Sequence, residues 1–91
     1  MNERIECIIT GRVQMVMYRD FAQRKARRLG CTGFVRNNAD SSVTVVAEGE
    51  RAKLEALVEK LRKGPVLSRV DSVEVLWKKA MGEFTEFKIE Y

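Results

Sequence analysis

Hydrophobic and polar residues alternate in five short stretches of the chain, the pattern of β-strands with one buried face. In the first, from about Arg4 to Val13, Ile5, Cys7 and Ile9 share one face, which predicts a well-buried strand. The turn-rich "NNADSS" at 37–42 predicts a hairpin between the second and third strands. The other strands are marked by Phe34 and Val35, by "VTVVAEG" at 43–49, by Val73, Val75 and Trp77, and by Phe87, Ile89 and Tyr91.

Two further stretches follow the period of an α-helix. From Asp20 to Leu29, apolar residues recur at i, i+4 and i+7; Asp20 is placed to cap or favour the helix start, and Gly30 to end the helix. The second stretch carries an i, i+3, i+4, i+7 stripe and stops at "GP", residues 64 and 65. The stripe consists of Leu54, Leu57, Val58 and Leu61.

This order of elements, β-α-β-β-α-β with a short fifth strand, predicts an α+β fold: a ferredoxin-like split βαβ sandwich, with an antiparallel sheet and two helices on one face. We expect a single domain over residues 1–91. Right-handed crossover makes the first two strands parallel, with the third between them. The loop at 14–19 should therefore lie near Arg36 and Asn37.

Composition is that of a globular chain: of 91 residues, 45% are apolar and 33% charged. No apolar run is long enough to span a membrane, and we expect a cytoplasmic monomer. With no histidine and only Cys7 and Cys31, a zinc site of the usual Cys/His kind and a histidine general base are both excluded. We expect both cysteines to be buried thiols.

The net charge of +4 favours a negatively charged partner, either a nucleic acid or a small anion. The densest basic run, "RKARR" at 24–28, lies within the first predicted helix. We interpret it as a solvated helix face.

The segment from Gln14 to Arg19 has the makings of an anion site. It offers free backbone N–H groups that lead into the positive end of a helix, together with the guanidinium of Arg19. Asn37, on the neighbouring strand, could orient a water molecule with its amide. On spacing alone, Arg19 could equally be a surface residue at a helix start, and Asn37 the first residue of a turn.

Three motifs bear on that choice: "GRVQ-V-YR" at 11–19, "GFVRN" at 33–37 and "D-SV-V-AEG" at 40–49. In this order and spacing the chain resembles the acylphosphatase family over nearly its whole length. The resemblance implies hydrolysis of the carboxyl-phosphate bond of a small-molecule acyl phosphate, with no metal or other cofactor, no nucleic acid and no membrane. It makes Arg19 the phosphate-binding arginine and Asn37 the residue that positions the attacking water. The phosphate-binding loop would comprise Gln14, Met15, Val16, Met17, Tyr18 and Arg19, and inorganic phosphate or sulfate could occupy it.

Met15 departs from the family pattern, which has glycine in "GRVQG". Met15 either adopts tolerable backbone angles and points out of the cradle, or distorts the cradle and leaves weak activity or binding alone. The hairpin departs as well, with "ADSS" at 39–42 where the family usually has "PDGS". Because serine disfavours positive φ, Ser41 predicts a turn of another type or a more mobile one.

Two other functions compete. An RNA-binding module of the same architecture would stack bases on aromatic residues of its central strands, but strand 43–47 reads Val-Thr-Val-Val-Ala. An acylphosphatase-like domain with weak or no turnover would bind phosphate or carbamoyl phosphate, like the N-terminal domain of hydrogenase maturation carbamoyltransferases. We expect the enzyme.

Overall fold

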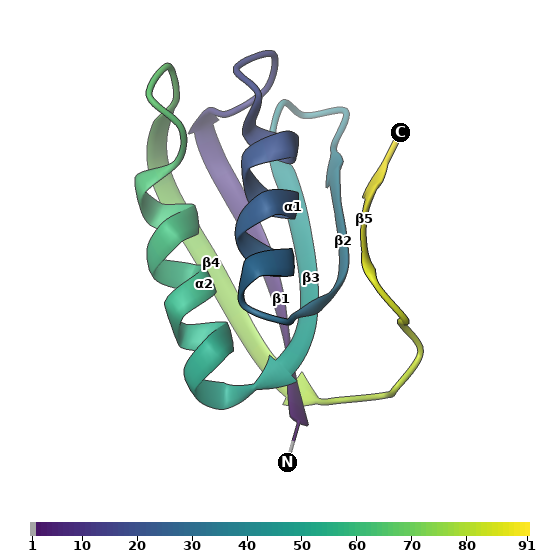
Figure 1. Ribbon diagram of the computed structural model, residues 1–91. Helices are drawn as coiled ribbons and strands as arrows, with labels where there is room; N and C mark the ends of the chain where they lie inside the picture. The colour runs from purple at the N-terminus through teal and green to yellow at the C-terminus, as the bar shows by residue number, and fades with distance from the viewer. Residues whose placement is uncertain (1) are drawn as a thin grey trace.

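The computed structural model describes residues 2–91, and its elements follow the predicted order. The strands are β1 (Asn2–Arg12), β2 (Thr32–Asn37), β3 (Val43–Glu50), β4 (Arg69–Lys79) and β5 (Phe87–Glu90), and the helices are α1 (Tyr18–Arg28) and α2 (Arg51–Lys63). Both helices cover the same face of one sheet, as Figure 1 shows. The α+β sandwich expected from the sequence is therefore confirmed.

The sheet has the strand order β4-β1-β3-β2-β5. β3 lies between β1 and β2 and is antiparallel to both, so the predicted insertion is confirmed. The predicted antiparallel pairing is confirmed for β1 to β4 but wrong for the added strand β5, which pairs parallel with β2 and makes the sheet mixed. The reason is topological: after β4 the chain crosses to the opposite edge, as Figure 1 shows, and there runs in the direction of β2.

The core lies between the sheet and the helices. Successive side chains of a strand point to opposite faces, so every second residue of the central strands faces α1 and α2. Burial raises the pKa of the Cys7 thiol to about 12, and Cys31 is also a buried free thiol, as predicted. The fully buried apolar residues include Ile5, Cys7, Ile9, Ala22, Ala26, Val43, Val45, Ala47, Leu54, Leu57 and Leu61.

Helix α1 begins two residues earlier than predicted, and Asp20 does not cap it. The N-cap is Met17, with φ 65° and ψ 24°, so a left-handed residue turns the chain into the helix. Asp20 lies in the first turn, where a carboxylate favours the positive helix end, and accepts a 3.0 Å hydrogen bond from Arg24. Gly30, with φ 74°, follows the helix as expected.

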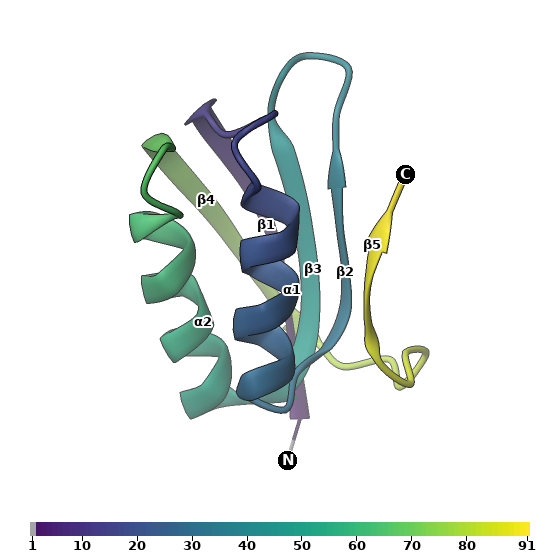
Figure 2. The ribbon, with the colours of Figure 1, turned by 45° about the horizontal axis from the view of Figure 1, so that its top comes forward.

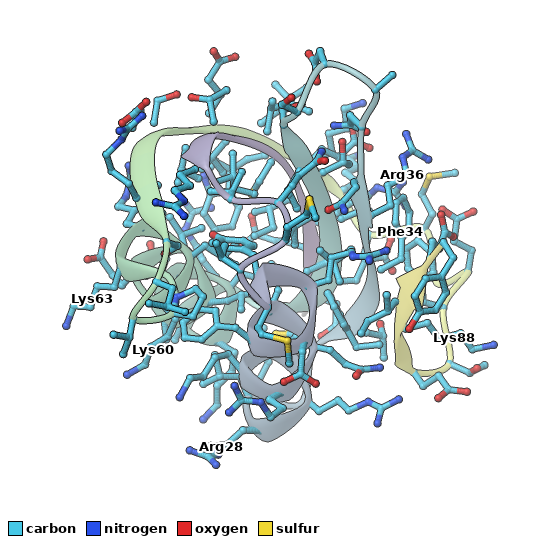
Figure 3. All side chains as sticks on the ribbon, turned by 90° about the horizontal axis from the view of Figure 1, so that it is seen from above. Arg28, Phe34, Arg36, Lys60, Lys63 and Lys88 are labelled. Atoms are coloured by element: carbon cyan, nitrogen blue, oxygen red, sulfur yellow. The ribbon has the colours of Figure 1, made fainter. Side chains whose placement is uncertain are left out.

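The basic run at 24–28 lies on α1. Ala26 faces the core, whereas Arg24 and Arg27 are more than half exposed, which confirms a solvated face. Figure 3 shows Arg28 and Lys60 projecting outward from the two helices. In residues 2–91, neither helix is long and apolar enough to cross a membrane.

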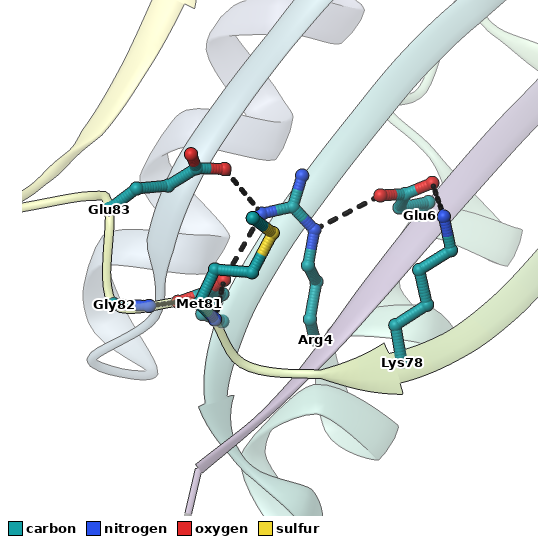
Figure 4. Close-up of polar contacts among 7 residues, drawn as sticks. Arg4, Glu6, Lys78, Met81, Gly82 and Glu83 are labelled. Atoms are coloured by element: carbon teal, nitrogen blue, oxygen red, sulfur yellow. Dashed lines mark hydrogen bonds and ion pairs between the residues drawn. The ribbon is translucent and has the colours of Figure 1, made fainter.

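Polar contacts of Arg4 with Glu83 help to fasten the segment between β4 and β5 to the sheet (Figure 4). A buried carboxylate, that of Glu48, adds to them. Glu48, 4% exposed, accepts hydrogen bonds from the backbone N–H groups of Met81 at 2.9 Å and Gly82 at 3.0 Å, and from Arg4 at 3.1 Å. Burial alone would raise the pKa of Glu48, but these donors outweigh it and hold the pKa below its ordinary value. The clamp fixes the start of the crossing that delivers β5 to the far edge.

Candidate active site

The loop between β1 and α1 begins at an irregularity in the sheet. The pairing of β1 with β4 shifts register between Thr10 and Gly11. Gly11 has φ 124°, and a Cβ there would lie 2.1 Å from the carbonyl oxygen of Arg69. A side chain is therefore excluded at Gly11, where β1 bends towards the loop. The close approach of the Arg69 carbonyl and the positive φ thus explain why residue 11 of the "GR" pair is glycine.

The loop has two left-handed residues, Met15 with φ 61° and Met17 with φ 65°. Left-handed residues in a short turn bring successive backbone N–H groups together in a concave nest that suits an anion. Because the loop also leads directly into α1, the positive end of the helix adds to the potential there. Met15 therefore adopts the backbone angle for which the family pattern has glycine, at a cost of about 1 to 2 kcal/mol.

Side chains of the loop alternate between the core and solvent. Val16 and Tyr18 are buried, and the Tyr18 hydroxyl donates a 2.6 Å hydrogen bond to the carbonyl oxygen of Leu61. Met15 and Met17 are 100% and 69% exposed. Val16 and Tyr18 anchor the loop in the core, so the backbone of the loop can contact a ligand. Of the two outcomes foreseen for Met15, its exposure fits a side chain that points away from the backbone cradle.

Gln14 joins this loop to the turn between β2 and β3. Its side-chain nitrogen donates to the carbonyl oxygens of Asn38 and Ser42, each at 2.8 Å. The loop before α1 and the turn between β2 and β3 lie at the same end of the sheet in Figure 2, as the right-handed crossover between β1 and β2 predicted. Gln14 was predicted to belong to the phosphate loop, and its side chain positions that loop against its neighbour.

The turn at 38–42 contains the other departure from the family pattern. Ser41 has φ 77°, so the expectation that serine would avoid positive φ was wrong. Hydrogen bonds offset the strain: Asp40 accepts from the Ser42 backbone N–H at 3.0 Å and from its hydroxyl, and Asn38 donates to Ser42 at 2.9 Å. The Ser42 hydroxyl, foremost, lowers the pKa of Asp40.

Arg19 and Asn37, the two predicted catalytic residues, line one cleft of about 540 Å³. The Arg19 guanidinium lies 4.9 Å from the centre of the Tyr91 ring and donates to the Glu90 carbonyl oxygen at 3.3 Å. Asn37 Oδ1 is buried without a hydrogen-bond partner among the protein groups of residues 2–91. The arginine, at the start of a helix, suits an anion, and the acceptor without a protein partner suits a water molecule.

Comparisons with known proteins show the family of the chain. The family model described as Acylphosphatase matches residues 5–89. The chain belongs to the acylphosphatase family. It is 46% identical over 88 residues to an acylphosphatase of Salinibacter ruber, covering 97% of this chain and 93% of that protein.

Solved structures extend the likeness to the whole acylphosphatase fold. The acylphosphatase of Bacillus subtilis superposes with a TM-score of 0.95 at 31% identity, covering 98% of this chain and 99% of that one. Full-length HypF in a phosphate- and nucleotide-bound form gives a TM-score of 0.92 at 29% identity, but this chain covers only 12% of it. The expectation of an acyl phosphate hydrolase is confirmed, and the domain with weak or no turnover is not favoured.

Sequence reasoning missed part of the cleft. Asp20, Ile89 and Tyr91 line it together with Val13, Asn37 and four residues of the predicted loop, Met15, Met17, Tyr18 and Arg19, whereas Gln14 and Val16 do not. Ile89 and Tyr91 were predicted only as residues of the last strand, because alternation marks a strand but not its neighbours. The parallel pairing of β5 with β2 brings them to the site.

Proposed function

We propose that the cleft hydrolyses acyl phosphates, with Arg19 and the backbone N–H groups of 15–19 holding the phosphate and Asn37 positioning the attacking water. The observation that carries the proposal is the cleft itself, which Arg19 and Asn37 line from different elements, with Asn37 Oδ1 unpaired among residues 2–91. Family membership supports the same roles, residue by residue, through the motifs at 11–19 and 33–37.

Phosphate binding is the first task of such a site. The positive end of α1, the nest at Met15 to Met17 and the Arg19 guanidinium all present hydrogen-bond donors to an anion. Donors fixed before the reaction stabilise the charge that spreads over the phosphoryl oxygens in the transition state. Arg19 is the strongest of them, because a guanidinium can bind two oxygens at once.

Water attack is the second task. Asn37 Oδ1 accepts a hydrogen bond from the water, whose oxygen forms a bond to phosphorus while the bond from phosphorus to the acyl oxygen breaks. The carboxylate leaves with the electron pair, and the water proton passes to a phosphoryl oxygen. Because a carboxylate is a good leaving group, positioning suffices and a strong general base is unnecessary. This suits a chain that contains no histidine.

We further propose that the protein is a monomer that works in the cytoplasm. Inorganic phosphate or sulfate would occupy the cleft as a product-like ligand. Support comes from the small size and charged surface, and from the arginine in the cleft.

The decisive experiment measures phosphate release from acetyl phosphate by the purified protein. We expect turnover that falls roughly a hundredfold or more in Arg19→Ala and in Asn37→Ala, with the melting temperature of each close to that of the natural protein. Arg28→Ala, on the outer face of α1, is the matched control. Binding of acetyl or carbamoyl phosphate without release of inorganic phosphate would instead establish a domain that binds without turnover. An Arg19→Ala variant of full activity would refute the role assigned to Arg19.

A further inference from the structure

The wall of the cleft beyond Arg19 and Asn37 is mostly apolar. Met15 and Met17 lie in the loop, 100% and 69% exposed, and the other side is lined by Ile89 of β5 and by Tyr91, which follows that strand. Large apolar side chains held this far into solvent are costly unless something covers them, and here they surround the place where a substrate would bind. The phosphate occupies little of a cleft of about 540 Å³, so room remains for the acyl group.

Charges in the cleft disfavour an acidic acyl group. The charged residues that line it are Arg19 and Asp20. Arg19 is engaged by the phosphate, and Asp20, which pairs with Arg24 at 3.0 Å, would repel a second carboxylate. Among the residues that line the cleft, an acyl group therefore meets apolar side chains, and a second carboxylate finds no cation beyond the one that holds the phosphate.

We propose that the cleft selects acyl phosphates with an uncharged apolar acyl chain, and that Met15 and Met17 are the residues that contact this chain and set the preference. The inference rests on the proposed hydrolysis of acyl phosphates and names its substrate class. Methionine suits the role, because its unbranched, polarisable side chain adapts to chains of different length. Met15 thereby has a function at the position where the family pattern has glycine.

A series of alkanoyl phosphates tests the preference in the natural protein. Acetyl, butanoyl and hexanoyl phosphate have leaving groups of similar reactivity and differ in apolar length. Because each methylene that leaves water contributes to binding, we expect kcat/KM to rise about two- to fourfold per methylene. Succinyl phosphate, which carries a second carboxylate, should react more slowly than butanoyl phosphate. Equal values across the alkanoyl series would overturn the inference.

Matched variants test the assignment to Met15 and Met17. Glutamine has nearly the length of methionine but is polar, and leucine is apolar; neither is β-branched, so both suffer a similar strain at positive φ. We expect the ratio of kcat/KM for hexanoyl to acetyl phosphate to fall severalfold in Met15→Gln/Met17→Gln and to persist in Met15→Leu/Met17→Leu. An unchanged ratio in the glutamine variant would refute the role of the two methionines.

The failure of this inference can be told apart from that of the proposed function. Hydrolysis of all alkanoyl phosphates at one rate refutes the preference alone, whereas phosphate release from none of them refutes the enzyme. Binding of alkylphosphonates, measured by calorimetry, requires no turnover. If affinity rises from methylphosphonate to hexylphosphonate, the apolar site is supported even in a protein that releases no phosphate. A constant affinity would refute the apolar site.

Discussion

The side-chain amide of Gln14 donates a 2.8 Å hydrogen bond to the carbonyl oxygen of Ser42, and so ties the loop before α1 to the turn after β2. A second bond of the same length reaches Asn38. The first segment leads to Arg19 and the second begins at Asn37, so one side chain sets the spacing of the two proposed catalytic groups. Reaction rates depend steeply on such spacing, since a displacement of about 1 Å can cost roughly a hundredfold.

We predict that Gln14→Met lowers both stability and activity. Methionine keeps the shape but removes both side-chain hydrogen bonds, while the carbonyl oxygens of Asn38 and Ser42 keep their backbone donors. The loss should cost about 1 to 2 kcal/mol of unfolding free energy. Chemical denaturation measures that loss, and kcat/KM for acetyl phosphate should fall about tenfold as the loops separate. Gln23→Met is the control, because Gln23, on α1, makes a single 3.4 Å side-chain hydrogen bond, to the carbonyl oxygen of Phe87 on β5. Equal kinetics in the two variants would contradict a positioning role for Gln14.

The strained serine of the β2–β3 turn gives a second prediction. Ser41 holds φ 77°, an angle that glycine adopts freely. Ser41→Gly should relieve about 1 kcal/mol of strain, partly offset by the greater entropy of glycine in the unfolded chain. We therefore expect a small rise in the melting temperature, and no rise in Ser41→Ala, which keeps the Cβ. A glycine variant that melts below the alanine variant would be inconsistent with strain at this residue.

Much of the fold could be predicted because its signals are local. The stripe from Leu54 to Leu61 predicts α2, and the alternation of Ile5, Cys7 and Ile9 predicts β1. Chirality of the crossover then placed the loop at 14–19 beside Asn37 without any contact being known. Motif spacing added Arg19 and Asn37, and both line the cleft.

Other features could not be predicted because they depend on pairing and backbone angles. Tyr91 reaches Arg19 only because β5 runs parallel to β2, and no local pattern specifies that edge. The positive φ of Met17 and Ser41 contradicts residue preference, which tertiary hydrogen bonds and packing override. Of the two roles predicted for Asp20, it lies in the first turn and favours the helix start but does not cap it, since the left-handed Met17 is the N-cap.

The contact between Arg19 and Tyr91 gives a third prediction. The guanidinium lies 4.9 Å from the ring centre, within the range of a cation–π interaction worth about 0.5 to 1 kcal/mol at an exposed site. Removing the ring in Tyr91→Ala should free Arg19 and weaken inhibition by inorganic phosphate about two- to fivefold. Tyr91→Phe keeps the ring and should behave like the natural protein. Equal inhibition constants for alanine and phenylalanine would show that the ring does not hold the arginine.

The Glu48 clamp makes the last prediction, which concerns pH. Glu48→Gln removes the charge that Arg4 and the N–H groups of Met81 and Gly82 surround, and should cost about 2 kcal/mol of unfolding free energy at neutral pH. The folded pKa of Glu48 is lowered, so its contribution is complete above the ordinary glutamate range and is lost as pH falls through the folded value.

Denaturation of both proteins between about pH 7 and pH 3 should therefore show a difference in stability that shrinks with acid. Glu83→Gln is the matched control: Glu83 also pairs with Arg4, at 2.6 Å, but its side chain is 46% exposed. An exposed ion pair contributes at most about 1 kcal/mol, so this variant should remain close to the natural protein throughout. A Glu48→Gln difference that stays constant or grows towards low pH would mean that the clamp does not depend on the carboxylate charge.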